Sequence, residues 1–284
     1  MNSFFQAARE NLFGHVAFLQ QRTPGMLVRD IGGAVIVDSG LASDTFNKVL
    51  WGGDADVGAL RAASDWFAGK RPRHMLTLPG TPMPPATERP FTVWAAFEDG
   101  SALRRRGQAF EREGFRVAET ETGMVLPLNR RPPSAAVPEG LRIEPVETPS
   151  GLAAFAEVAA ANWTPPDEAV KRFYKLTERV LLQGVGPMRL FVAFAGDAPA
   201  ACGELFMSDG GNLAGLHMIC TREAFRRRGV GGAVTEALLR AGRAAGASLA
   251  VLQASAAGEP VYRRLGFEAC GLFAEYAAGE EILF

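Results

Sequence analysis

The segment 213–245 places the strongest limit on how this chain can fold. Apolar residues dominate 213–221 after a turn at Asp209–Asn212, which predicts a strand. A short basic loop follows, and then residues 230–245 predict a helix. Its apolar face is formed by residues at helical spacing: Val230, Val234, Ala237, Leu238 and Ala241.

The loop before this helix is rich in arginine and glycine. It reads Arg-x-x-Gly-x-Gly from Arg226 to Gly231. Glycine lets a backbone approach a ligand closely, and the first N–H groups of a helix lack partners and carry partial positive charge. The pattern therefore predicts a pyrophosphate-binding loop. Its residues are Arg226, Arg227, Arg228, Gly229, Val230, Gly231 and Gly232.

Residues 141–284 contain a clear series of predicted strands and helices. Periodicity and turn residues predict the order β-α-α-β-β-β-α-β-α-β. The further strands are expected at 141–146, 189–195, 200–207 and 249–253, and the further helices at 149–163, 167–183 and 259–265.

The first 131 residues give weaker patterns. Helices are expected at 3–21 and 57–69, strands at 74–78 and 91–97, and apolar segments at 26–38 and 48–51. Residues 110–115, followed by a strand, resemble 262–267, followed by another. This predicts a weak internal repeat of about 140 residues. Chance similarity between two helix ends is the alternative.

A proline-rich stretch separates these halves. Residues 130–140 contain three prolines and no periodicity, and proline stiffens and extends a connection. We expect an N-terminal domain at 1–131, a linker at 132–140 and a second domain at 141–284.

Composition excludes several classes of protein. The net charge is −1 and neither half has the large excess of positive charge typical of nucleic-acid binding, so we expect no nucleic-acid partner. Three scattered cysteines and three distant histidines give neither a disulfide framework nor metal-ligand spacing. With no signal peptide and no apolar run of about 18 residues, we expect no membrane association and a cytoplasmic protein.

A second motif lies one strand beyond the loop. Residues 255–267 contain Tyr-x-x-Leu-Gly-Phe from Tyr262 to Phe267. The order of strand, Arg-x-x-Gly-x-Gly, helix, strand and this motif resembles the GNAT superfamily of N-acetyltransferases over 141–284. The resemblance implies an α/β (α+β) fold with a mixed, mostly antiparallel twisted sheet flanked by helices. The N-terminal half would be a degenerate copy in a tandem GNAT-like chain.

The resemblance also implies how acetyl-CoA would be held. Strands 213–221 and 249–253 would splay apart around the donor. The backbone of Ile219, Cys220 and Thr221 would pair with the pantetheine arm, and N–H groups of 227–232 would hold the pyrophosphate. Ser255 stands where many relatives have Asn, which puts its cofactor contact in doubt.

Three side chains are candidates for proton transfer. By resemblance, Tyr262 would protonate the departing thiolate, and its alternative role is as a core aromatic. A base for the acceptor amine could be His217, because its unperturbed pKa is near 6.5, or Glu204 on the preceding strand. Either residue could be structural instead, and a water chain could serve as the base.

A look-alike motif occurs in the N-terminal half. Arg104–Ala109 also fits Arg-x-x-Gly-x-Ala, but Gly107 precedes Gly114 too closely for a helix and a strand between them. We expect its arginines to be a solvated helix face. Phe110 replaces the tyrosine, so this half would lack both cofactor loop and acid and would shape the acceptor cleft.

These observations predict an acetyl-CoA-dependent N-acetyltransferase. The acceptor would be a small-molecule or peptide primary amine that attacks directly in a ternary complex, without a metal. The sequence leaves the acceptor and the oligomeric state open. The alternative is a non-catalytic acyl-CoA-binding sensor or partner-binding protein. A Rossmann-type nucleotide-binding domain conflicts with the hairpin before the motif and lacks the acidic residue expected about 20 positions beyond the glycines.

Overall fold

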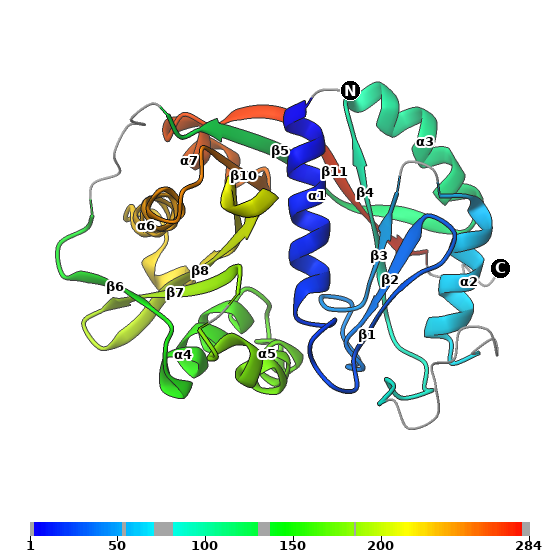
Figure 1. The fold of residues 1–284 in the computed structure, drawn as a ribbon, viewed down its shortest axis with the longest axis horizontal. Helices are drawn as coiled ribbons and strands as arrows, with labels where there is room; N and C mark the ends of the chain where they lie inside the picture. The colour runs from blue at the N-terminus through cyan, green and yellow to red at the C-terminus, as the bar shows by residue number, and fades with distance from the viewer. Residues whose placement is uncertain (1–2, 53–54, 71–81, 130–136, 185, 280–284) are drawn as a thin grey trace. The chain divides into compact units, whose positions relative to one another are not determined.

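The described residues form two compact units. The computed structural model describes residues 3–52, 55–70, 82–129, 137–184 and 186–279 (Figure 1). Unit 1 combines Met1–His15 with Thr122–Cys270, and unit 2 combines Val16–Glu121 with Gly271–Phe284.

Unit 1 is built on a mixed sheet. Its strand order is β5-β10-β9-β8-β7-β6; β9 and β10 are parallel, and the other neighbours are antiparallel. The strands are β5 (Phe115–Pro127), β6 (Leu141–Pro145), β7 (Met188–Ala195), β8 (Ala198–Ser208), β9 (Leu213–Thr221) and β10 (Leu249–Ala254).

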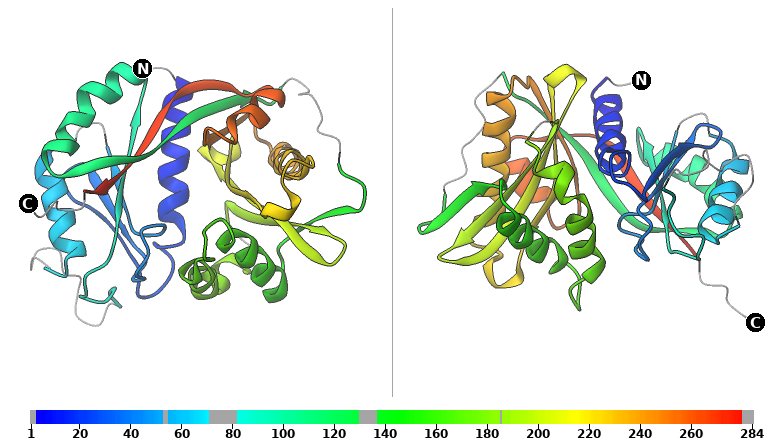
Figure 2. Two further views of the ribbon diagram at one scale, coloured as in Figure 1. Left: turned by 180° about the vertical axis from the view of Figure 1, so that it is seen from behind. Right: turned by 60° about the horizontal axis from the view of Figure 1, so that its bottom comes forward.

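Helices cover both faces of this sheet. α6 (Val230–Ala244) lies on one face, and α4 (Pro149–Ala160) and α5 (Glu168–Leu181) lie on the other (Figure 2). Leu205 packs with α6 in a core that includes Val234 and Leu238. Because successive strand residues point to opposite faces, Glu204 faces α5. Short helical segments complete the unit: η2 (Asp209–Gly211), η3 (Glu223–Phe225) and α7 (Glu259–Arg264).

Local chemistry sets the ends of α4 and α5. Thr148 caps α4 by accepting a hydrogen bond from Gly151 N–H at 3.1 Å, and Asp167 caps α5 by accepting one from Ala169 N–H at 2.8 Å. The helix predicted to reach residue 163 ends at Ala160. Pro165 and Pro166 follow, and proline disfavours helical backbone before it.

Unit 2 also contains a mixed sheet. Its order is β1-β2-β3-β4-β11-β5, with β3 and β4 parallel. Its helices α2 and α3 pack against one face around Trp66, Phe67 and Phe110. The elements are α1 (Ser3–Phe18), shared with unit 1, β1 (Leu27–Asp30), β2 (Ala34–Asp38), β3 (Lys48–Trp51), α2 (Val57–Phe67), β4 (Thr92–Phe97), α3 (Gly100–Arg112) and β11 (Glu268–Ala278).

Several predicted elements of this half differ in detail. The helix expected at 3–21 ends at Phe18. The apolar segment 26–38 forms two antiparallel strands, because Gly32 and Gly33 adopt positive φ angles of 80° and 87° between them. The strand expected at 74–78 lies outside the described residues.

Two strands contribute to both units. β5 begins in unit 2 and pairs with β10 of unit 1 from Thr122 onward, whereas β11 begins in unit 1 and pairs with β4 of unit 2. Each follows a helix that ends at a left-handed glycine, Gly114 at φ 83° or Gly266 at φ 92°. The two similar sequence segments therefore have the same local structure.

The two units follow from the way the strands pair, and their boundaries do not lie at the proline-rich stretch. Residues 130–136, which include most of the proline-rich stretch, lie outside the described residues. The division into 1–131, 132–140 and 141–284 stays a prediction. The predicted fold class, a mixed and mostly antiparallel sheet flanked by helices, is confirmed.

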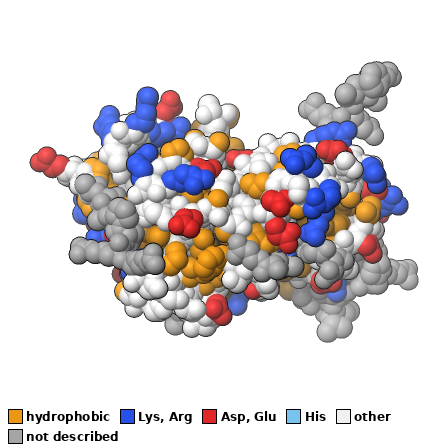
Figure 3. All heavy atoms as spheres, turned by 90° about the horizontal axis from the view of Figure 1, so that it is seen from above, with side chains coloured by type: hydrophobic (Ala, Val, Ile, Leu, Met, Phe, Trp, Pro, Cys, Tyr) orange, Lys and Arg blue, Asp and Glu red, His pale blue; other side chains and the backbone are white. Residues whose placement is uncertain are grey.

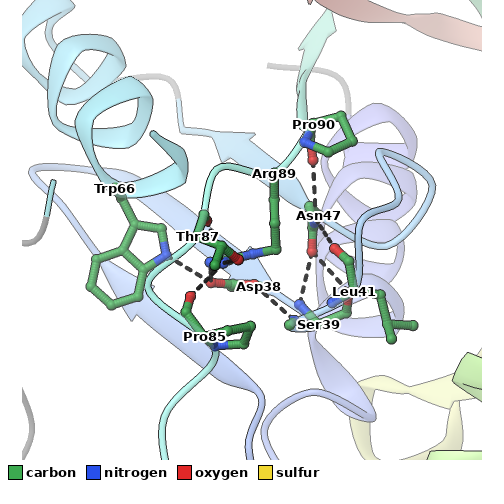
Figure 4. A network of polar contacts seen from close by, with 10 residues as sticks. Asp38, Ser39, Leu41, Asn47, Trp66, Pro85, Thr87, Arg89 and Pro90 are labelled. Carbon is green, nitrogen blue, oxygen red and sulfur yellow. Dashed lines mark hydrogen bonds and ion pairs between the residues drawn. The ribbon is translucent and has the colours of Figure 1, made fainter. Parts of the chain in front are cut away.

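A buried ion pair ties together the loops of unit 2 (Figure 4). Asp38 accepts hydrogen bonds from Arg89 Nη2 at 2.7 Å and Trp66 Nε1 at 2.8 Å. Arg89 also donates to the carbonyl oxygens of Pro85 and Thr87. Asn47 donates to those of Leu41 and Pro90. Most of the acceptors for Arg89 and Asn47 are backbone carbonyl oxygens of loop residues, so these hydrogen bonds hold the loops in position.

Candidate active site

β9 and β10 separate partway along their length. Their parallel pairing runs from Leu213–Leu249 to Leu216–Leu252, whereas β9 continues to Thr221 and stays paired with β8 on its other edge. The β8–β9 register shifts between Cys202 and Glu204, and Met218 has a φ of 47°. One backbone edge of residues 217–221 therefore has no pairing with β10. The sequence predicted the gap between these strands along this unpaired edge.

The arginine–glycine loop leads from this gap to α6. Arg226 Nε donates to the carbonyl oxygen of Thr221 at 2.9 Å. Arg227 and Gly229 adopt left-handed backbone, with φ angles of 60° and 80°. The Arg226, Arg227 and Arg228 side chains are exposed.

The first N–H groups of α6 lack hydrogen-bond partners within the helix. Among the described residues no side chain caps it, and its first hydrogen bond runs from Ala233 N–H to Gly229 O at 3.0 Å. The N–H groups of Val230, Gly231 and Gly232 therefore have no carbonyl partner within the helix. With the helix dipole, they provide a site for an anion. A Cβ added at Gly231 would lie 3.3 Å from Thr221 Oγ1, so a side chain there would crowd the loop.

Tyr262 and Ser255 lie beyond β10. Tyr262 is 8% exposed on α7 and packs edge-to-face with Phe267 at 6.0 Å between ring centroids. Ser255 Oγ accepts a hydrogen bond from Gly258 N–H at 3.3 Å, and its carbonyl oxygen accepts Glu259 N–H at 2.9 Å. Ser255 thus forms the turn that begins α7.

A buried polar cluster surrounds Glu204, which is 2% exposed. Glu204 Oε1 accepts a hydrogen bond from Tyr174 OH at 2.7 Å, and Oε2 lies 2.6 Å from His15 Nε2. The His15 ring stacks on His217 with 3.9 Å between centroids. His217 Nε2 lies 2.9 Å from Asn11 Oδ1. We call these five residues the polar cluster.

Neighbouring groups fix the protonation of His217. Asn11 Nδ2 donates to the carbonyl oxygen of Phe206 at 3.2 Å and lies 2.7 Å from Ser208 Oγ, so its Oδ1 accepts. His217 Nε2 therefore carries a hydrogen. Burial lowers the pKa of His217 well below its ordinary value, and the neighbouring His15 ring would oppose a charge on it further. His217 is neutral at pH 7.

The structure brings some of the sequence candidates together. Ile219, Cys220 and Thr221 lie along the gap and join the loop at 226–232. His217 and Glu204 face each other across β8 and β9 within the polar cluster. Sequence reasoning missed His15 and Asn11, which lie 189 and 206 residues from their partners in a helix without a motif.

In unit 2, strand β3 precedes helix α2 as β9 precedes α6 in unit 1. There Asp56 caps α2, and its side chain accepts a hydrogen bond from Ala59 N–H at 3.2 Å. A carboxylate of the chain itself thus occupies the end that is uncapped in α6. The look-alike arginines Arg104, Arg105 and Arg106 are exposed on α3, as predicted.

In the described ranges, no helix has the length and apolarity needed to cross a membrane. Likewise, no group of three His, Cys, Asp or Glu side chains in the described part of the chain is placed to hold a metal ion. On the face drawn in Figure 3, basic and acidic side chains are interspersed.

Residues 153–267 match the model of the Acetyltransferase (GNAT) family. The match includes β9, the arginine–glycine loop, α6, β10 and α7. No curated protein matches the sequence.

Solved structures similar to this one cover both halves of the chain. A GCN5-related N-acetyltransferase from Kribbella flavida has 15% identity and a TM-score of 0.65, with 97% of each chain covered. Another from Sphaerobacter thermophilus has 17% identity and a TM-score of 0.57, covering 89% of this chain and 84% of that one. A tandem GNAT protein from the clavulanic acid biosynthesis pathway has 14% identity and a TM-score of 0.56, covering 97% and 96%. At these identities the likeness concerns the fold.

Proposed function

We propose that the protein transfers the acetyl group of acetyl-CoA to a primary amine, since residues 153–267 match the model of the Acetyltransferase (GNAT) family. The amine attacks the thioester directly in a ternary complex. The main support is the gap between β9 and β10, which leads through the arginine–glycine loop to the uncapped N-terminus of α6.

The donor is proposed to lie along this gap. Ile219, Cys220 and Thr221 offer backbone groups to the pantetheine arm, because that edge of β9 is not paired with β10. N–H groups of the loop and of the first turn of α6 bind the pyrophosphate, and the exposed charges of Arg227 and Arg228 attract the phosphates.

Tyr262 is proposed to protonate the departing thiolate. Its hydroxyl is on α7, directly after the turn that Ser255 forms, and a general acid of this kind contributes about 10²–10⁴-fold to rate. Ser255 stays a proposed neighbour of the cofactor, although its hydroxyl also serves the turn. His217 and Glu204 belong to the acceptor side, where they hold the polar cluster.

The N-terminal half is proposed to bind no acetyl-CoA. Asp56 caps α2 at the place that corresponds to the open end of α6, and a carboxylate there opposes a phosphate. Catalysis is therefore assigned to the domain predicted at 141–284.

Acetyl-CoA binding at the loop can be tested with one pair of double variants. Arg227→Glu/Arg228→Glu should weaken acetyl-CoA binding at least tenfold in calorimetry, because it reverses charge at the loop. Arg104→Glu/Arg106→Glu makes the same charge change on α3 and should leave binding unchanged. Equal affinities for the two double variants contradict the proposed site.

Thiol release with a panel of primary amines tests the reaction itself. The panel should contain a polyamine, an amino sugar, lysine and a peptide with a free N-terminus. Tyr262→Phe should reduce thiol release about 10²–10⁴-fold without weakening acetyl-CoA binding. Tight binding with no turnover of any amine favours a non-catalytic acyl-CoA sensor.

A further inference from the structure

His15 has one engaged ring nitrogen and one without a partner. Nε2 lies 2.6 Å from Glu204 Oε2, whereas Nδ1 is buried and has no hydrogen-bond partner among the described residues. A buried polar atom without a partner is rare in folded proteins and calls for an explanation.

The carboxylate determines which nitrogen carries the proton. Ionised Glu204 can only accept hydrogen bonds, and Tyr174 OH already donates to its other oxygen at 2.7 Å. His15 Nε2 must therefore donate. In the neutral ring, Nδ1 is then left with a free lone pair and can accept a proton.

The other candidates in the polar cluster are less suited to accept a proton. Both oxygens of Glu204 are engaged, by Tyr174 and by His15. His217 donates from Nε2 to Asn11, and burial holds its pKa well below the ordinary range. Its neutral ring stacks on His15 and limits the motion of that ring.

The cluster adjoins the place proposed for the acetyl group. Glu204 is paired with His217 in the β8–β9 register, and His217 is the first β9 residue after the last pair with β10. On β10, Gln253 follows that last pair, and its Nε2 is also buried without a hydrogen-bond partner in the described part of the chain. Two buried polar atoms without a partner, His15 Nδ1 and Gln253 Nε2, thus belong to residues near the β9 side and the β10 side of the gap.

We propose that His15 is the general base that deprotonates the acceptor amine. Glu204 and Tyr174 are positioning residues that hold its Nε2–H tautomer and stabilise the imidazolium. The inference rests on the acetyl transfer proposed above and assigns its missing base to a residue of α1.

The protons balance over one turnover. The acceptor ammonium gives one proton to His15 Nδ1, and the neutral amine attacks the carbonyl carbon of the thioester. The C–N bond forms and the C–S bond breaks. The nitrogen loses its second proton to solvent, while Tyr262 gives its proton to the thiolate and takes one back from solvent. His15 then releases its proton to solvent, so one proton is released in each turnover.

The variant His15→Gln distinguishes a role of His15 as a base from a purely structural role. The glutamine amide can still donate to Glu204 from near the position of Nε2, but it has no basic lone pair. We expect kcat to fall about 10²–10⁴-fold for an amine whose ammonium pKa is near 10. The affinity for acetyl-CoA and the melting temperature should not change.

The acceptor itself provides the second readout. Hydrazine is mostly neutral at pH 8.5 and needs no base before attack, so the variant should lose much less activity with hydrazine than with the panel amine. Added imidazole should restore part of the lost activity. Gln6→Ala, which changes an exposed residue on the same helix, should behave as wild type.

Three results would overturn the inference. The first is full turnover of the high-pKa amine by His15→Gln. The second is an equal loss with both amines, which indicates a structural role. The third is a Nδ1–H tautomer of His15 in a ¹⁵N NMR spectrum at pH 7. These leave the proposed function intact, whereas no turnover of any amine by the wild type removes both.

Discussion

Tyr174 OH donates a 2.7 Å hydrogen bond to Glu204 Oε1, which joins α5 to β8 inside the core of unit 1. Both side chains are almost fully buried, so neither has water as an alternative partner. Burial raises the pKa of Tyr174 well above its ordinary value, and the charge of Glu204 adds to the effect. Tyr174 therefore keeps its proton and stays a donor at neutral pH.

Removing that donor should destabilise the protein. Tyr174→Phe leaves a buried carboxylate oxygen without its partner, and we expect the free energy of unfolding to fall by about 1.5–3 kcal/mol in urea titrations. Tyr276→Phe is the matched control. The Tyr276 hydroxyl is buried with no hydrogen-bond partner among the described residues, so its removal should be neutral or stabilising. Equal losses would contradict this account.

The buried ion pair of unit 2 should be sensitive to loss of one partner. Arg89→Met leaves Asp38 charged and buried, and we expect about 3–5 kcal/mol of destabilisation in the same urea titrations. Arg61→Met removes an exposed partner of Glu113 and should change stability little, because solvent screens that pair. Similar effects of the two substitutions would argue against burial as the cause.

Stability should fall in mild acid because of His217. Its pKa in the folded protein lies below the unfolded value of about 6.5, so the unfolded chain takes up the proton first. The stabilising contribution of neutral His217 is complete above pH 6.5 and is lost as pH falls towards the folded-state pKa. Thermal melts from pH 7.5 to 5 should show this loss in wild type. His217→Gln keeps the donor to Asn11 and should give a flatter profile.

Glu121 should have the opposite pH dependence. Burial, followed by the charges of Glu119 and Glu275, raises its pKa to about 7, although Lys48 opposes the shift. The folded protein therefore holds a proton that the unfolded chain loses near pH 4.5, and stability falls as pH rises through this window. Glu121→Gln should raise the melting temperature at pH 8.5 and leave it unchanged at pH 4. A gain of equal size at both pH values would contradict the shifted pKa.

Local sequence patterns predicted most of unit 1. The strand 213–221 was predicted with the bounds observed, because a turn and an apolar run define it. The helix at 230–245 differs from α6 by one residue, because the apolar face and the glycines mark it clearly. The N-terminal half was less predictable, since short strands such as β1 leave no clear alternation over four residues.

The polar cluster and the shared strands could not be predicted in the same way. His15 occupies a helix whose sequence gives no sign of Glu204, and their contact depends on tertiary packing. Likewise, the periodicity of β5 shows that it is a strand, but periodicity does not say which strand lies beside it. The glycine at 114 and the phenylalanine at 115 repeat those at 266 and 267, yet the repeat does not reveal that each following strand contributes to both sheets.

The shared strands affect how this protein can be divided or evolve. A fragment of residues 141–284 would lack Thr122–Pro127, leave one edge of β10 open and carry Gly271–Ala278 without β4. Open strand edges invite pairing with other chains. A gene encoding one half alone would thus encode a polypeptide with open strand edges, which favour aggregation. Within one chain, β5 and β11 cover these strand edges.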